Sequence, residues 1–296
     1  MGANLKEVRT RIKSVISTQQ ITKAMKMVSA AKLRRAQQAI VQLRPYSVKL
    51  SNMLQNVLSG LEGDADTVFN KEREVHNVAI VIVTSNRGLA GALNTNIGKA
   101  AVNLVQTTFA PQYQSGNVTF FPIGKKGNEY TQRYLPRAKY VTDYVDAFSD
   151  LSFDAISKIA NRIMEDFTVN SFDEVHIVYS QFKNAGMQEA TVEQFLPVKR
   201  VPVIERNAVR ADYIFEPDKK VLLDTLIPTI LHTQFLKTLL DTHASEHGAR
   251  MTAMEKATDN ANNLLTELKI NYNKARQEAI TRELSEIVGG AAALEG

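Results

Sequence analysis

The chain of 296 residues contains no cysteine and no tryptophan. Without cysteine it has no disulfide, no thiolate metal ligand and no thiol redox switch. Its longest unbroken apolar run, Val78–Val83, is far shorter than the roughly 20 residues that a membrane-spanning helix needs. The sequence opens MGANLKEVR, which is neither a secretion signal nor an Arg-rich, acid-poor leader. We therefore expect a cytoplasmic protein that does not cross a bilayer.

Acidic residues are almost missing from the N-terminal sixth of the chain. Residues 1–50 hold 11 Lys and Arg and the single acid Glu7, which gives this segment a net charge of +10. The rest of the chain holds 25 basic and 30 acidic residues, a net charge of −5. Such a segment favours an acidic partner, and charge alone leaves open whether this is a protein surface, an anionic lipid or a nucleic acid.

Glycine is absent from Asn4 to Leu58, and this stretch is rich in strong helix formers. It predicts one long helix, which Pro45 is expected to bend or restart. The apolar residues fall at helical spacing and then resume one residue out of phase, which predicts a coiled-coil seam with a discontinuity. The expected seam positions are Leu5, Val8, Ile12 and Val15 before the slip, and Ile21, Ala24, Val28 and Ala31 after it.

The middle of the chain has the pattern of an α/β domain. A β-branched run at His76–Thr84 predicts a strand buried on both faces, followed by a glycine-bearing loop and a helix from Thr95. The other expected elements are strands at 118–123, 174–179 and 191–198, the last at a sheet edge, and a helix near 150–169. Alternating strands and helices predict a mainly parallel sheet.

After Pro217 the chain becomes helical again, to about Val288, with seam residues alternately four and three apart over five heptads. This period of 3.5 is that of a coiled coil. About 70 helical residues form a rod on the order of 100 Å long. The expected seam positions are Leu240, Ala244, His247, Met251, Met254, Thr258, Ala261, Leu265, Leu268, Tyr272, Ala275 and Ala279.

We therefore predict a long antiparallel coiled coil of the N- and C-terminal helices with an inserted Rossmann-like α/β domain. The expected boundaries are an N-terminal helix at 1–58, a linker at 59–74, the α/β domain at 75–205 and a C-terminal helix at 206–296.

Three motifs have alternative interpretations. The loop Ser85–Asn96 lies where α/β folds bind phosphate, but it matches neither glycine-rich fingerprint, so we favour a tight turn before an N-capped helix. His243, Glu246 and His247 match the H-x-x-E-H motif of inverted zinc peptidases, but His247 falls on the seam, where it would be buried. The basic N-terminal helix lacks a dense basic block, so we favour a protein-facing surface over nucleic acid.

The sequence resembles the γ subunits of F-type ATP synthases. The resemblance is carried by ITKAMKMVSAAKLRRA (21–36), SNRGLAGALN (85–94), EHGARMTAMEKATDNA (246–261) and NKARQEAITRELSEIVGGAAAL (273–294). The family's loop often reads SDRGLCGGLN, so Asn86, Ala90 and Ala92 depart from it, as does Gly248, where alanine is common. The absence of a cysteine-bearing regulatory insertion and of a mitochondrial leader implies a bacterial member.

The resemblance implies a central rotor shaft that has no catalytic residue, cofactor or metal of its own. A ring of three α and three β subunits would surround the coiled coil and carry out the ATP chemistry. The ε subunit and the c ring of the membrane rotor would lie near the α/β domain, at the cytoplasmic face of the bacterial inner membrane. No nucleic-acid partner is implied. The residues expected to face β subunits are Lys23, Met25, Lys26, Arg250, Arg276, Gln277 and Thr281.

The C-terminal tip, Val288–Gly296, is made of small side chains. Gly289 and Gly290 would ordinarily end a helix, and a free terminus of this composition would fray. In the family the tip lies inside an apolar sleeve at the top of the ring, where small apolar residues suit an axle end. The alternative interpretation is a tail that contacts nothing.

Overall fold

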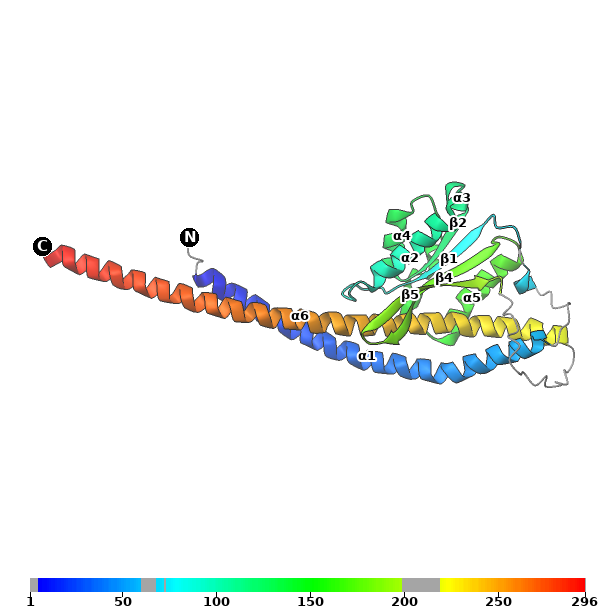
Figure 1. Ribbon diagram of the computed structural model, residues 1–296, viewed down its shortest axis with the longest axis horizontal. Helices are drawn as coiled ribbons and strands as arrows, with labels where there is room; N and C mark the ends of the chain where they lie inside the picture. Colours follow the sequence, from blue (N-terminus) through cyan, green and yellow to red (C-terminus); the bar gives the residue numbers. More distant parts are fainter. Residues whose placement is uncertain (1–4, 60–67, 72, 199–218, 296) are drawn as a thin grey trace. The chain divides into compact units, whose positions relative to one another are not determined.

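The computed structural model describes residues 5–59, 68–71, 73–198 and 219–295. The chain divides into two compact units, one formed by Met1–Ser29 with Arg250–Gly296 and the other by Ala30–Ala249. The helices α1 (Leu5–Ser59) and α6 (Lys219–Glu295) each contribute to both units (Figure 1). Most of the linker predicted at 59–74, and the domain boundary predicted at 205–206, lie outside the described residues.

The described part of the second unit contains a five-stranded sheet with the order β3-β2-β1-β4-β5. The central strand β1 (Val78–Val83) pairs in parallel with β2 (Val118–Ile123) and β4 (Glu174–Asn184). The short β3 (Lys139–Tyr140) continues the parallel order, and β5 (Met187–Leu196) runs antiparallel to β4 at the edge. The mainly parallel sheet and its edge strand are thus confirmed, although β4 and β5 extend further into a hairpin than the sequence predicted.

Helices cover both faces of the sheet, which explains why every residue of β1 is buried. On one face, α2 (Leu93–Thr107) packs its buried residues against alternate side chains of β1 and β2, and α4 (Lys125–Tyr134) contacts α2. On the other face, α5 (Phe153–Thr168) and the N-terminal part of α6 form a second apolar cluster with the sheet. Figure 1 shows α2 and α4 on one side of the strands and α5 on the other.

Three short segments of the α/β body were missed by the sequence reasoning: α3 (Ala110–Gln114), β3 and the 3-10 helix η2 (Thr142–Ser149). Helix α4 was missed as well, because its sequence KKGNEYTQRY is polar and carries a glycine. It buries only Gly127 and Thr131, so it offers no apolar stripe at helical spacing.

The predicted phase slip in the N-terminal seam is wrong. Ile21 and Val28 are 59% and 57% exposed, whereas Thr22 and Ser29 are buried, at 8% and 3%. The seam therefore continues in phase through polar residues, because heptad geometry rather than side-chain polarity decides which positions face the partner helix. The α1 positions of the first unit that continue this seam are all buried or half-buried: Leu5, Val8, Ile12, Val15, Gln19, Thr22, Lys26 and Ser29.

The C-terminal heptad pattern is confirmed, since all of its twelve predicted seam positions are buried or half-buried. Two possible helix breaks are absent. Pro45 lies inside α1, so the helix does not restart there, and α6 continues through Gly289 and Gly290 to Glu295. The two long helices are therefore more continuous than their helix-breaking residues suggest.

Candidate partner interface on the terminal helices

In the first unit the terminal helices are joined by polar pairs across the seam. Lys26 Nζ donates to Glu255 Oε1 over 2.5 Å, and the hydroxyls of Thr22 and Thr258 lie 2.8 Å apart. Gln19 Nε2 donates to Asn262 Oδ1. From pair to pair, the position on α1 falls by four and then by three, while the position on α6 rises by three and then by four. The helices are therefore antiparallel in this unit.

The two threonine hydroxyls take part in more contacts than they have hydrogens. Thr22 Oγ1 lies 3.0 Å from the carbonyl oxygen of Gln19, and Thr258 Oγ1 lies 2.8 Å from that of Met254. With the contact between the hydroxyls, two hydrogens serve three oxygen contacts. A hydrogen bond between the two helices therefore requires one threonine to donate to the other hydroxyl instead of to the carbonyl oxygen of its own helix.

Replacing Thr22 by valine is expected to lower the free energy of unfolding by about 1 kcal/mol, because the contact across the seam is lost. The double variant with Thr258→Val should cost less than the sum of the two single variants, by roughly 0.5 kcal/mol or more. Urea unfolding followed by circular dichroism measures all four members of the cycle. Additive single effects would contradict a hydrogen bond between the two hydroxyls.

The structure places the predicted interface residues in two groups. On α1, Lys23 is exposed, whereas Met25 and Lys26 are half-buried and the Lys26 ammonium is already paired with Glu255. Arg276, Gln277 and Thr281 are exposed on α6. Arg276 lies 21 positions from Glu255, or about 30 Å along the helix. One partner side chain cannot contact both groups.

Arg250 differs from the other predicted interface residues because it is only 9% exposed. Little of its side chain is therefore open to another subunit in the described structure.

Two groups of exposed apolar side chains on the terminal helices were missed as an outward surface. On α6, Ile280, Leu284 and Ile287 are 48%, 56% and 68% exposed. Their spacing of four and three residues is the signal that could have identified them, because it places them on one helical face away from the seam. On α1, Ile21, Met27 and Val28 are between 57% and 60% exposed.

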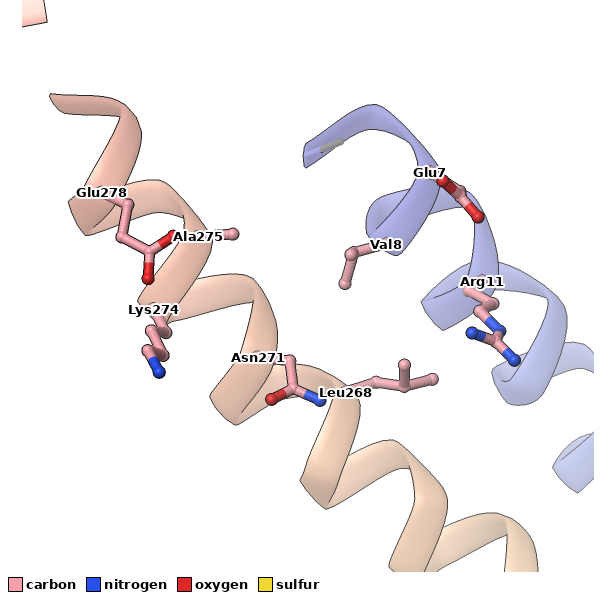
Figure 2. A pocket seen from close by; sticks show the side chains of 8 residues that line it. All are labelled: Glu7, Val8, Arg11, Leu268, Asn271, Lys274, Ala275 and Glu278. Atoms are coloured by element: carbon pink, nitrogen blue, oxygen red, sulfur yellow. The ribbon is translucent and has the colours of Figure 1, made fainter. Parts of the chain in front are cut away.

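A cavity of about 300 Å³ lies between the two helices near the chain's N-terminus (Figure 2). Val8 and Leu268 point into the space between the helices, and Ala275 leaves room beside them. Side chains of both charges line it: Glu7 and Arg11 from α1, and Lys274 and Glu278 from α6. The lining contains no histidine or cysteine and balances its charges, so it does not form a catalytic acid-base set.

The position at which open α/β sheets bind nucleotides is occupied by the chain itself. Such ligands bind beyond the carboxyl ends of the strands where the strand order reverses, here beside β1 and β4. In β4, just beyond the residues that pair with β1, the Ser180 amide donates to Thr242 Oγ1 over 3.2 Å, and Ser245 Oγ donates to the Ser180 carbonyl over 3.1 Å. Helix α6 thus satisfies the backbone groups that a ligand would otherwise contact.

The loop after β1 is held by its own side chains. Asn94 Nδ2 donates to Ser85 Oγ over 2.8 Å, and the Ser85 amide donates to Asn94 Oδ1 over 3.1 Å. The expected side-chain cap of the following helix is absent, because α2 begins after Ala92 and the Asn94 side chain is directed to Ser85 instead. The tight turn is confirmed, with Leu89 and Gly91 at positive φ.

The titratable groups with large pKa shifts lie outside this interface. Burial raises the pKa of Tyr179, and the neighbouring Glu193 raises it further. The phenol therefore stays protonated and donates to Glu193 Oε2 over 3.1 Å, while Gln234 donates to Glu193 Oε1 over 2.7 Å. This network joins β4, β5 and α6 and stabilises the body rather than preparing a reaction.

Taken together, an antiparallel pair of helices with exposed apolar and basic side chains defines a protein that acts through partners. The family model described as ATP synthase matches residues 4–294. An ATP synthase gamma chain of Cytophaga hutchinsonii is 50% identical over 293 residues, covering 98% of this chain and 99% of the relative. That of Flavobacterium psychrophilum is 50% identical over 294 residues, covering 99% and 100%. The chain belongs to the ATP synthase γ-chain family.

Solved structures share the fold at much lower identity. A chain of the Euglena gracilis mitochondrial ATP synthase, from a structure of OSCP, F1 and the c ring, has a TM-score of 0.64 at 22% identity, covering 98% of this chain and 94% of that one. A chain of the Tetrahymena thermophila enzyme's central stalk and c ring has a TM-score of 0.58 at 23% identity, covering 80% and 99%.

Proposed function

We propose that this chain is the central rotor shaft of an F-type ATP synthase and acts without an active site of its own. The observation that carries this function is the 50% identity to ATP synthase γ chains over almost the whole length of both chains. Its partners are the α and β subunits of the catalytic ring, the ε subunit and the c ring. Rotation driven by proton flow is coupled to conformational change at the catalytic β subunits, and hydrolysis drives the reverse.

The physical basis of the coupling is the asymmetry of the shaft. Each orientation of an asymmetric shaft stabilises a different conformation of each surrounding β subunit, so rotation changes nucleotide affinities in sequence. Torque thereby becomes a difference in binding free energy. Protons crossing the membrane supply that torque, at about 2.3 kcal/mol per charge for each 100 mV.

The function is tested by purification. An affinity-tagged chain is expected to co-purify with α and β subunits in the ring ratio of three to three to one, and the purified chain alone should not hydrolyse ATP. Salt-sensitive binding to duplex DNA at micromolar protein, without ring subunits, would instead support the nucleic-acid alternative.

The ring-facing surface of α1 is proposed to combine Lys23 with the exposed apolar residues Ile21, Met27 and Val28. Exposed apolar side chains this close together favour burial against another protein, and a basic neighbour favours an acidic rim on that protein. On α6, Arg276, Gln277 and Thr281 would form a separate contact about 30 Å further along the shaft.

None of the helices among the described residues has the length and apolar character needed to span a membrane. The chain would therefore be attached to the membrane through its partners. We place it at the cytoplasmic face of the bacterial inner membrane, as expected for a bacterial member of the family.

The C-terminal tip is proposed to turn inside an apolar sleeve of the ring. The exposed stripe of Ile280, Leu284 and Ile287 leads toward this tip and supports an apolar environment for the end of the shaft. The side chains from Ala292 onward lie outside the described residues.

Deleting residues 289–296 is expected to leave assembly and most coupled activity intact, because the tip guides rotation more than it transmits force. Inserting two bulky charged residues at Ala292 should impair assembly or turnover, since an apolar sleeve cannot solvate the charges. ATP-driven proton pumping in membrane vesicles measures both variants. A harmless insertion would mean that the tip lies in solvent.

A further inference from the structure

Two histidines face each other one helical turn apart on α6, within the second unit. The Nε2 atoms of His243 and His247 lie 3.1 Å apart, and their ring planes are inclined at 80°. His247 is 5% exposed, whereas His243 is half-buried. The ring of His243 also meets the ring of Phe148 from η2 in an edge-on contact, with 5.9 Å between centroids. Packing against η2 therefore restrains the ring of His243.

We propose that this pair binds one Zn²⁺ ion, with His243 Nε2 and His247 Nε2 as its protein ligands. Two Zn–N bonds of about 2.0–2.1 Å in tetrahedral geometry place the nitrogens roughly 3.3 Å apart. The observed separation of 3.1 Å differs from this by a few tenths of an ångström. Small rotations of the two rings are enough to admit the ion, and imidazole nitrogen is a preferred ligand of zinc.

The coordination shell of this site is completed by water. No group of three His, Cys, Asp or Glu side chains is arranged as a metal site in the described parts of the chain. The half-buried His243 provides the solvent side. An ion with two protein ligands exchanges readily, so the site is labile and differs from the closed, four-ligand sites that hold structural zinc. It also lacks the third protein ligand of zinc hydrolases, so binding brings no peptidase activity.

Zinc binding would make the packing of the α/β body depend on the concentration of free zinc. An ion bound to both imidazoles fixes the rotamer of His243, and this ring packs against Phe148. The turn of α6 and the η2 segment would thereby be restrained together. The proposal does not depend on the shaft function, because it concerns only residues within the second unit.

The competing interpretation is a direct hydrogen bond between two neutral imidazoles, which also spans about 3 Å. The two interpretations differ in their response to added zinc. Other histidines could bind zinc weakly with a neighbouring carboxylate, since His176 lies 2.8 Å from Glu174 and His76 lies 3.6 Å from Glu74. These pairs provide matched controls.

The test is calorimetric titration of the full chain with zinc chloride, together with thermal unfolding. The native chain should bind one ion, and zinc at about ten times its Kd should raise the Tm by about 3 °C. His243→Gln should weaken binding at least tenfold, and so should His247→Gln. His76→Gln and His176→Gln should bind like the native chain.

The proposal is wrong if His243→Gln binds zinc as tightly as the native chain, or if a control variant removes the binding. His247 is buried, so its replacement could unfold the chain, whereas the half-buried His243 tolerates glutamine more readily. Visible absorption of Co²⁺ added in place of zinc gives a second measurement, which should show the absorption of a nitrogen-ligated ion only when both histidines are present.

Discussion

Replacing Lys23 by glutamate is expected to lower the number of protons pumped per ATP hydrolysed at least about twofold, while the ring still assembles. Lys23 is exposed on α1 and takes no part in the Lys26–Glu255 pair. The physical reason is that a reversed charge repels the acidic partner surface that the basic segment favours. The shaft then binds the β subunits less tightly, and less torque is transmitted between them.

The measurement compares ATP hydrolysis and ATP-driven proton pumping in the same vesicles. Lys99→Glu is the matched control, because Lys99 is also exposed and the charge change is equal, but it lies on α2. Unchanged coupling in the Lys23 variant, or an equal loss in the control, would remove Lys23 from the proposed interface.

Lys26 requires a different design, because its ammonium already contacts Glu255 at 2.5 Å. A Lys26→Glu variant places two carboxylates together, so reduced coupling could come from the shaft itself. Adding Glu255→Lys restores an ion pair with the charges exchanged. If the double variant recovers native coupling, Lys26 acts within the shaft, and if coupling stays low, Lys26 contacts the ring.

The largest expected loss of stability comes from replacing Gly124 by alanine. Gly124 joins β2 to α4 at a φ of +105°, a region that residues with a side chain rarely adopt. A Cβ atom there would lie 2.0 Å from the carbonyl oxygen of Thr84, which is backbone at the end of β1 and cannot move aside without disturbing the sheet. Strain and overpacking together are expected to cost on the order of 4 kcal/mol.

Gly116→Ala separates the two causes of this loss. Gly116 also has a positive φ, of +73°, but a Cβ atom there has no heavy atom within 4 Å. Its replacement should cost only the conformational strain, about 1–2 kcal/mol. Urea unfolding compares the two variants with the native chain. Equal losses at both positions would mean that the contact with Thr84 contributes nothing.

Much of the fold could be predicted because its pattern is local. The C-terminal seam repeats at the coiled-coil period over five heptads, and all twelve positions face inward. The run VAIVIV is buried on both faces, as continuous β-branched residues predict. In both cases many residues repeat the same preference, so single exceptions do not obscure it.

The N-terminal seam shows where this reasoning fails. Apolar residues at 21, 24, 28 and 31 suggested a seam one residue out of phase, yet the structure buries Thr22 and Ser29 instead. The polar positions are acceptable inside because α6 supplies Thr258 as a partner for Thr22. A single helix cannot indicate what faces it, so its pattern alone gives the wrong face.

The interface could be predicted only as a set of residue types. The resemblance selected Lys23, Arg276 and their neighbours. The separation of the two groups became known only when the structure showed which part of α6 lies beside Lys26. The pairing of Lys26 with Glu255 joins residues distant in the sequence, and the burial of Arg250 is a property of the folded chain. Neither could be derived from the spacing of the interface residues themselves.

By itself the sequence determined the class of the protein: two long helices around an α/β domain, a basic N-terminal segment and no cysteine chemistry. Each of these properties depends on many residues, so a wrong prediction at one position does not change the conclusion. Only the tertiary structure decided which face of α1 is buried, which charges are already paired and that α6 bonds the backbone of β4 at Ser180. Each of these depends on a contact between segments far apart in the chain, and side-chain packing and hydrogen bonding establish such contacts only when the chain is folded.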